Sequence, residues 1–193
     1  RLCFSFASAG GVANNQVWSE QNVIQINNWN LLTVVKNEDS IYHYVNGVDV
    51  TSGNNSIQHF PESYIHSIEN INIGWSGENI DTQEGSQWLK GEVDRISFWN
   101  TSLTDEEIEL YMMCPPTGQE DGLVGYWNFN EGLGDSLYDI SGNGNQGTIY
   151  GATFSEDVPE ETCSILDQLN ASFDAWNISI DLSAGWNMFG YGC

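Results

Sequence analysis

The chain has 193 residues, of which 27 are Asp or Glu and 4 are Lys or Arg, so its formal net charge is −23. That charge excludes a nucleic-acid partner, because four cations cannot form the basic patch that replaces condensed counterions, and an anionic membrane surface would repel the chain. Hydrophobic residues make up 40% of the sequence and aromatic residues 12%, which argues against intrinsic disorder because such a chain can bury a core.

The predicted elements are mostly short strands separated by turns. Leu2, Phe4 and Phe6 alternate with polar or small residues, which is typical of a strand. Further strands are predicted within residues 17–26, 29–35, 41–45, 48–50, 70–75, 89–99, 123–129 and 148–154. Asn46-Gly47 separates two of them and predicts a hairpin, because both residues tolerate a positive φ. No apolar run reaches the roughly 18 residues that a membrane span needs, so no membrane insertion is expected.

Two segments have helical patterns. Thr104 is the expected N-cap of the first helix, and Glu107 stands three residues later, as a capping box requires. Pro115-Pro116 should end this helix. The second predicted helix runs from about Cys163 to Trp176, where apolar residues recur at helical spacing.

The sequence divides into three parts. Residues 1–155 hold the strands and the first helix, residues 156–162 are acidic and contain a proline, and residues 163–193 begin a second module. No helix alternates with strands, so a parallel α/β sheet is excluded. We therefore expect an all-β fold, an antiparallel jelly-roll β-sandwich with one short capping helix, followed by a short C-terminal α/β remnant. Both ends of the sequence are expected to be cuts in a longer, secreted or surface-bound chain.

The four cysteines are Cys3, Cys114, Cys163 and Cys193. No CxxC pair or Cys/His cluster is present, so a zinc site is not expected. Cys163 and Cys193 bracket the last segment, which favours that pairing and leaves Cys3 with Cys114. Four free, buried thiols are the alternative.

Three sequence segments, in order, resemble those of a known family. They are NWNLLTVVKNEDSIYHYVNGVDV (28–50), WLKGEVDRISFWNTSLTDEEIELY (88–111) and GLVGYWNFNEGLGDSLYDISGNGNQGTIYGATF (122–154). Together they resemble laminin-G-like or pentraxin-type domains of the concanavalin A-like lectin/glucanase kind, over about residues 1–155. The resemblance implies a jelly roll, with Trp29 and Trp99 expected between its two sheets. The tail AGWNMFGYGC resembles the start of a module that follows such domains in secreted marine bacterial proteins.

The resemblance also implies a calcium site. The loop SGENIDTQEGSQ (76–87) resembles the calcium loop of pentraxin-type domains, where carboxylate and amide oxygens supply the ligands. By that match Glu78, Asn79, Asp81 and Gln87 would hold Ca²⁺, and the alternative is an acidic, solvated loop. A weaker candidate is the turn with Asp139, Asn143 and Asn145, which imitates the first half of a calcium loop but has Tyr150 where the last Glu should stand. A structural turn is the favoured interpretation there.

The sequence argues against an enzyme. Glucanases on this fold place several carboxylates on one strand face, and Glu92-Val93-Asp94 matches the first half of that motif. Ile96 and Ser97 occupy the positions where the second glutamate should stand. Retaining hydrolysis therefore has no acid, and solvent-facing carboxylates near Lys90 and Arg95 are the simpler interpretation.

Sugar binding remains as the candidate function. Trp75, Trp88 and Tyr64 border the region of the predicted calcium loop, and aromatic rings stack on sugar faces, although core packing is the alternative for each tryptophan. We expect a non-catalytic extracellular module, secreted or on a cell surface, that binds a glycan or a cell-surface or matrix protein. Calcium dependence is part of this expectation. A structural spacer without a ligand is the alternative, and a glycan hydrolase is a remote one.

Overall fold

The structure is a computed structural model that describes residues 2–7, 14–37, 40–53, 71–76, 87–160 and 163. The strands are β1 (Cys3–Ala7), β2 (Asn14–Ser19), β3 (Leu32–Asn37), β4 (Ser40–Val45), β5 (Val48–Asp49), β6 (Thr51–Ser52), β7 (Trp75–Ser76), β8 (Gln87–Trp88), β9 (Ile96–Trp99), β10 (Leu123–Trp127), β11 (Ser136–Leu137) and β12 (Gly147–Thr148), and the helix is α1 (Asp105–Met113). Within these residues no helix has the length and apolar character needed to cross a membrane.

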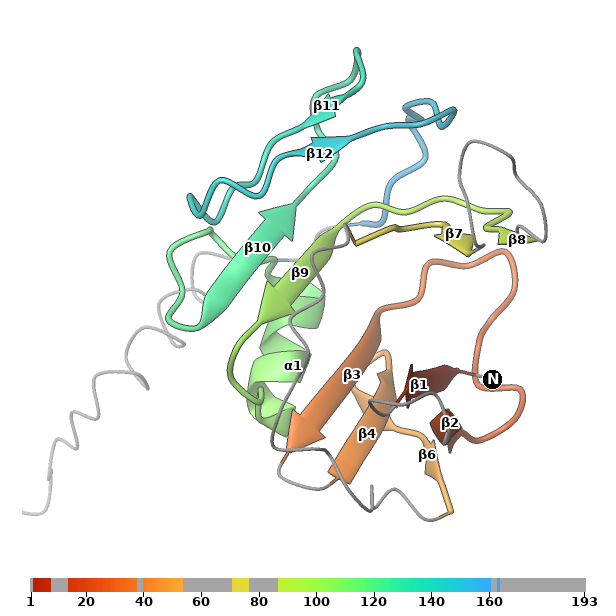
Figure 1. Cartoon of the computed structure of the whole chain (residues 1–193). Coiled ribbons are helices and arrows are strands. Elements are labelled where there is room, and N and C mark those ends of the chain that lie inside the picture. Colours follow the sequence, from red (N-terminus) through yellow and green to blue (C-terminus); the bar gives the residue numbers. More distant parts are fainter. Residues whose placement is uncertain are drawn as a thin grey trace, which may run out of the picture.

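All the strand pairs among the described residues are antiparallel, as predicted (Figure 1). Two three-stranded sheets have the orders β1-β2-β6 and β3-β4-β5, and three strand pairs are β9–β10, β11–β12 and β7–β8. The all-β class with one short helix is thereby confirmed. The second predicted helix and the C-terminal remnant lie outside the described residues, apart from Cys163.

The β4–β5 hairpin shows how local sequence sets strand register. Asn46 and Gly47 both have positive φ, 52° and 78°, which fits the twist of a tight two-residue hairpin. Asn46 also accepts the backbone N–H of Leu31 on its side-chain oxygen at 2.8 Å. The turn therefore ties the start of β3 to the hairpin, and Val45 pairs with Val48 directly beside it.

Strand β4 is the most buried strand because both of its faces are covered. On one face Ile41 packs with Val17 of β2 and Phe4 of β1. On the other face Tyr44 packs with Val35 of β3 and Ile108 of α1. Period-two alternation produces this division, since successive side chains of a strand point to opposite faces. The β3-β4-β5 sheet is thus the middle layer between β1–β2 and α1 (Figure 1).

Helix α1 joins two strand groups. Its capping box is present as predicted, with the Thr104 hydroxyl accepting from the Glu107 N–H at 3.2 Å and the Glu107 carboxylate accepting from the Thr104 N–H at 2.8 Å. The Tyr44 hydroxyl donates to Asp105 at 2.8 Å, at the start of the helix. On the other side, Trp99 of β9 stacks on Tyr111 of α1 with ring centroids 5.0 Å apart.

The two tryptophans expected between the sheets are placed differently. Trp29 is half-buried, and its indole N–H donates to Asp157 at 3.3 Å. This hydrogen bond attaches the segment after β12 to the loop before β3. Trp99 covers α1 and is also only half-buried. The predicted strand 89–99 is shorter than expected, because only Ile96–Trp99 pairs with β10. Irregular backbone from Leu89 to Arg95 precedes it.

Candidate functional site

The predicted calcium loop falls mostly outside the described residues. Glu78, Asn79, Asp81 and Tyr64 are not described, and only the backbone of Gln87 is. The ends of the loop are placed by the β7–β8 pair, in which Trp75 is opposite Trp88 and Ser76 is opposite Gln87. Among the described residues no group of three His, Cys, Asp or Glu side chains is arranged to hold a metal. The calcium ligands at this loop therefore stay a prediction.

The β7–β8 pair brings the two predicted sugar-binding tryptophans together. Antiparallel register sets Trp75 and Trp88 at the same position of the ladder, and the Leu89 N–H donates to the Gly74 carbonyl at 2.7 Å just beyond it. The side chain of Trp88 is 45% exposed, so a large part of its ring area lies at the surface. A tryptophan that served only the core would be expected to bury more of that ring.

The turn after β11 is a hydrogen-bonded structural turn. The buried Asp139 carboxylate accepts from the Tyr126 N–H at 3.0 Å, the Ser141 N–H at 3.0 Å, the Ser141 hydroxyl at 2.6 Å and the Asn145 N–H at 2.9 Å. The Asn143 and Asn145 amides both donate to the Val124 carbonyl of β10. A cation at Asp139 would have to displace these donors, so the geometry favours the structural interpretation over calcium.

The protonation of Asp139 follows from the same contacts. Burial acts to raise the pKa of this carboxyl, but the hydrogen bonds from Ser141, Tyr126 and Asn145 outweigh burial and hold the pKa at about 2, below its ordinary value of 3.8. Asp139 is therefore ionised throughout the physiological range. It fixes the turn to β10 and so determines where the neighbouring Tyr138 lies.

The residues of the half glucanase motif do not lie on a strand. Glu92 and Asp94 belong to the irregular segment before β9, so strand alternation does not direct their side chains to one face. Asp94 forms an ion pair with Arg95, whose Nε lies 3.7 Å from the carboxylate, as the sequence suggested. The Glu92 side chain is exposed.

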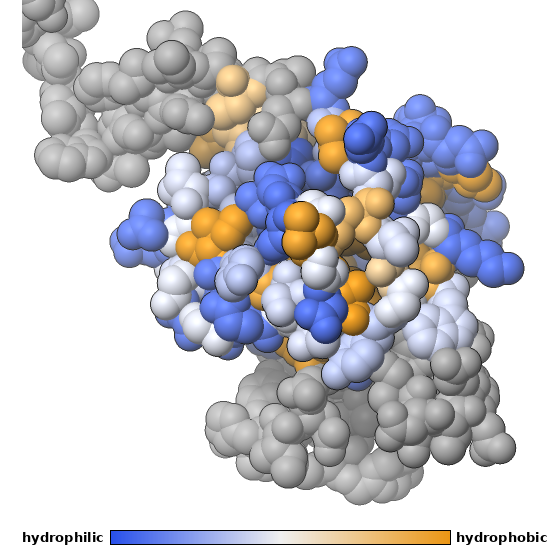
Figure 2. All heavy atoms as spheres, turned by 90° about the horizontal axis from the view of Figure 1, so that it is seen from above, coloured by the Kyte–Doolittle hydropathy of each residue, from blue (hydrophilic) through white to orange (hydrophobic). Residues whose placement is uncertain are grey.

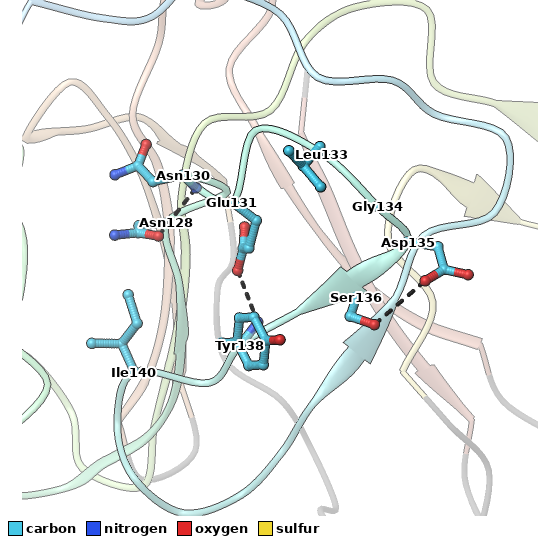
Figure 3. A pocket seen from close by; sticks show the side chains of 9 residues that line it. All are labelled: Asn128, Asn130, Glu131, Leu133, Gly134, Asp135, Ser136, Tyr138 and Ile140. Atoms are coloured by element: carbon cyan, nitrogen blue, oxygen red, sulfur yellow. Dashed lines mark hydrogen bonds between the residues drawn. The ribbon is translucent and has the colours of Figure 1, made fainter.

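A hollow that the sequence did not predict lies between the end of β10 and β11. It measures about 700 Å³, and its polar lining comes from Asn128, Asn130, Glu131, Asp135, Ser136 and Tyr138 (Figure 3). The Tyr138 side chain is 63% exposed beside it. The face of the molecule at the β11–β12 end carries small apolar groups surrounded by hydrophilic side chains (Figure 2). In the sequence this region is a glycine-rich stretch with one tyrosine among amide and carboxylate residues. That pattern is typical of an ordinary loop, so it does not predict a hollow.

The backbone around the hollow is held by hydrogen bonds. Glu131 accepts the Tyr138 N–H at 2.9 Å, and Asn128 accepts the Asn130 N–H at 3.2 Å. The second carboxylate oxygen of Glu131 is buried and has no hydrogen-bond partner among the described residues. Phe129 has a φ of 54°, a left-handed conformation that is rare for a bulky residue. Strain of this kind tends to occur where the surrounding structure fixes a functional geometry.

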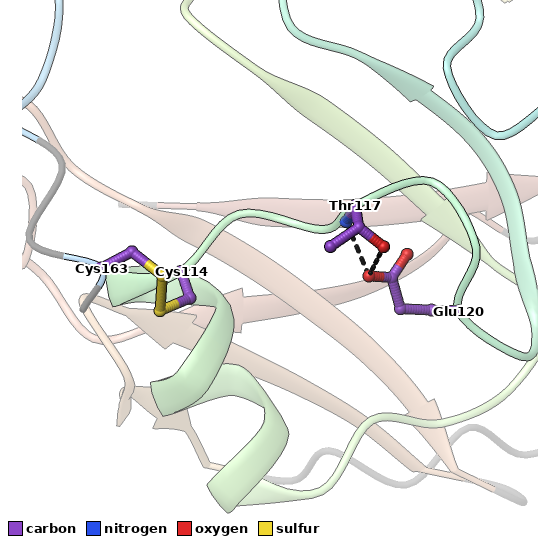
Figure 4. The surroundings of a disulfide bond; sticks show 4 residues. All are labelled: Cys114, Thr117, Glu120 and Cys163. Atoms are coloured by element: carbon purple, nitrogen blue, oxygen red, sulfur yellow. Dashed lines mark hydrogen bonds between the residues drawn. A yellow bond between two sulfur atoms is a disulfide. The ribbon is translucent and has the colours of Figure 1, made fainter. Parts of the chain in front are cut away.

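The predicted disulfide pairing is wrong. Cys114, at the end of α1, is bonded to Cys163 (Figure 4). Cys3 is an exposed free thiol. Cys193 lies outside the described residues. The chain after α1 runs through β10, β11 and β12 and returns to the helix end, which brings Cys163 within a Cα–Cα distance of 4.6 Å of Cys114. Sequence spacing carries no information about such a return.

Comparison with known proteins identifies the family. The family model described as the concanavalin A-like lectin/glucanases superfamily, of Laminin_G_3 type, matches residues 2–109, which is more than half of the chain. The chain belongs to this superfamily. The resemblance over residues 28–50 and 88–109 is thereby confirmed, whereas the hollow lies C-terminal to the matched range of this lectin/glucanase-type domain.

No curated protein matches the sequence. Among solved structures, an S-layer domain-containing protein (residues 221–444) from Clostridium thermocellum is similar, with 20% sequence identity and a TM-score of 0.39. The match covers 57% of this chain and 50% of that one, so this chain spans about half the length of the solved structure that it matches.

Proposed function

We propose that the chain is a non-catalytic, extracellular carbohydrate-binding or adhesion module of a larger secreted or surface protein. The observation that carries this proposal is the exposed side chain of Trp88, a residue that is opposite Trp75 in the backbone register of β7–β8, within a superfamily that includes lectins. Tryptophan offers a large apolar face with a polar N–H at its edge, and a sugar ring presents a complementary apolar face edged by hydroxyls.

An extracellular location is supported by the disulfide. Cys114–Cys163 closes a long loop, and stable disulfides are formed in oxidising compartments rather than in the cytosol. The very acidic composition fits a salty medium in which counterions screen self-repulsion.

The absence of catalysis in this proposal rests on the half motif. Glu92 and Asp94 lie in irregular backbone, and Asp94 is paired with Arg95. Retaining hydrolysis needs two carboxyl groups about 5 Å apart on the two sides of the scissile bond. Release of reducing sugars from a panel of β-glucans by the intact chain tests this point, and any turnover that Glu92→Gln abolishes contradicts it.

Calcium dependence is a separate part of the proposal and rests on the sequence of residues 76–87. A bound ion stabilises the folded state by mass action, by about 2.7 kcal/mol at one hundred times the Kd. Calcium should therefore raise the melting temperature of the chain relative to EDTA. Asp81→Ala should abolish that rise, and Asp121→Asn, which changes another acidic residue, should preserve it. An unchanged melting temperature for the original chain contradicts calcium binding.

A glycan array probed with the intact chain, with and without calcium, tests the main proposal. We expect binding to a subset of glycans, and Trp88→Ala should weaken it by about tenfold because the stacking face is lost. Tyr150→Ala is the matched control, since this side chain is 70% exposed and is not part of β7–β8 or the hollow. Signals at background under both conditions would leave the structural-spacer alternative.

A further inference from the structure

The Cys114–Cys163 disulfide connects the C-terminal end of α1 directly to the chain after β12 (Figure 4). The two cysteines are separated by 49 residues in the sequence, and their Cα atoms are 4.6 Å apart. Strands β10, β11 and β12 therefore lie within a covalently closed loop. Residues 164–193 follow Cys163, so a pull from that side of the chain reaches the disulfide before it reaches any of these strands.

Without the disulfide, the β11–β12 pair would be the first of these strands to come under tension. Its ladder joins Ser136 to Thr148 and Leu137 to Gly147, and each strand is two residues long. A pull from the C-terminal side acts at Thr148, at one end of the ladder. Hydrogen bonds that are pulled from one end of a ladder break one after another rather than together, so this pair would open at low force.

The contacts behind β12 would then break in the same sequential way. The turn between β11 and β12 is attached to β10 by the Tyr126 N–H, which donates to Asp139, and by the Asn145 amide, which donates to the Val124 carbonyl. Trp127, the last residue of β10, is opposite Ile96, the first residue of β9. Tension that passed the turn would act at that end of the β9–β10 ladder and would unzip β10 from β9.

The disulfide offers tension a different route. From Cys163 the tension passes through the two sulfur atoms to Cys114 and into α1, and the loop between them carries none because its ends cannot move apart. Helix α1 is anchored against such a pull. Ile108 is 1% exposed and packs on the β3-β4-β5 sheet, and Asp105 accepts the Tyr44 hydroxyl at 2.8 Å.

We propose that this disulfide is a mechanical bypass, which carries tension from the C-terminal side of the chain into α1 and keeps β10, β11 and β12 folded under that tension. The inference rests on the proposed function for the source of the tension, because a module of a surface protein that holds a glycan or an adhesion partner is pulled from two sides. The turn at Asp139 then stays in place until α1 itself detaches.

Single-molecule force spectroscopy of the intact chain, held by handles at its two ends, tests the inference. Complete unfolding of the original chain should release about 170 Å less contour length than unfolding of a variant with Ser at both Cys114 and Cys163, because 49 residues of about 3.5 Å each stay closed in the loop. The Ser variant should also show an early event at low force, as β12, β11 and β10 are unzipped. The original chain should lack this event.

The original chain by itself provides a second measurement that does not require the Ser variant to fold. Dithiothreitol, added while the unfolded original chain is held under tension, reduces the disulfide to two thiols and is itself oxidised to a cyclic disulfide. The chain should then lengthen by about 170 Å in a single step, since the 49 residues of the loop are released together.

Two substitutions in the original chain show where the tension acts. Thr104→Ala removes the N-cap of α1 and should lower the force at which α1 detaches. Asp139→Asn should leave the unfolding forces of the original chain unchanged, although it costs more stability in urea, because the turn lies outside the path of the tension. Asp121→Asn, the matched control for charge, should also leave them unchanged. A disulfide that only raised overall stability would give the larger fall in force with Asp139→Asn.

The outcomes separate this inference from the proposed function. Equal contour lengths for the original chain and the Ser variant, an early low-force release in the original chain, or a larger fall in force with Asp139→Asn than with Thr104→Ala overturns the bypass. None of these measurements involves a glycan. If the forces are as expected and the glycan array stays at background, the proposed function fails and the bypass stands; glycan binding together with equal contour lengths gives the reverse.

Discussion

Asp139 is the residue whose replacement should be most informative about stability. Asp139→Asn keeps the shape of the side chain but removes the charge and turns an NH₂ group toward backbone N–H donors. The pKa of about 2 in the folded chain, against an ordinary 3.8, corresponds to about 2 kcal/mol of stability at neutral pH. The backbone N–H groups that would face the new NH₂ group lose their acceptor, which adds a further penalty. We therefore expect the free energy of unfolding to fall by about 2–4 kcal/mol in total at pH 7.

The pH dependence of this loss has a definite sign. Because the folded state lowers the pKa of Asp139, the stabilisation is fully present above the ordinary value of 3.8 and disappears as the pH falls towards 2. The difference in unfolding free energy between the original chain and Asp139→Asn should therefore narrow by about 1 kcal/mol between pH 7 and pH 3.

Urea unfolding followed by tryptophan fluorescence measures both quantities. Asp121→Asn is the matched control, because Asp121 is exposed in the turn just before β10 and its replacement makes the same change in charge. The control should change stability by less than about 0.5 kcal/mol. A loss as small as the control's at pH 7, or a gap that does not change with pH, would refute the role assigned to the Asp139 carboxylate.

Three other substitutions test the contacts that stabilise the fold around the candidate sites. Thr104→Ala removes the N-cap of α1 and should cost about 1 kcal/mol in urea unfolding; no loss would contradict the capping box. Replacing both Cys114 and Cys163 with Ser should cost about 4 kcal/mol, given a sequence separation of 49 residues, and non-reducing peptide mapping of the original chain should recover this pair rather than one with Cys3. Burial lowers the pKa of His43, although Asp49 acts to raise it. The contribution of neutral His43 to stability is therefore fully present above the ordinary pKa of 6.5, and it is lost as the pH falls through the lowered pKa of the folded chain. His43→Leu should therefore reduce the fall in melting temperature between pH 7 and pH 5. An equal fall in the original chain and the variant would contradict this.

Local chemistry was predicted well from the sequence. The Asn46-Gly47 hairpin and the Thr104–Glu107 capping box form as expected, because each depends on residues that are adjacent or three positions apart. Strand positions were predicted better than strand lengths. Residues 89–95 alternate like a strand, but their backbone is irregular, and β9 begins only at Ile96, where β10 provides a hydrogen-bonding partner.

The candidate sites show the same difference between features set by neighbouring residues and features set by the path of the chain. Trp75 and Trp88 were grouped from the sequence because they flank one loop, and the structure pairs them in register. The sequence does not predict the hollow at residues 128–140, because Glu131, Asp135 and Tyr138 line it only when the chain folds back between β10 and β11. The sequence predicts a turn at Asp139, whereas one of the four hydrogen-bond donors to its carboxylate, the Tyr126 N–H, comes from β10, 13 residues away.

The sequence by itself determined the all-β class, the capped helix after Thr104, the superfamily and the acidic character of the surface, because strand alternation, capping and charge depend on neighbouring residues. Only the tertiary structure decided that Cys114 pairs with Cys163, that Trp29 reaches Asp157, and that a hollow with a largely polar lining lies beside Tyr138. Each of these contacts joins segments whose approach depends on the path of the whole chain, and the free energy that brings them together is shared among many residues rather than encoded in any local motif.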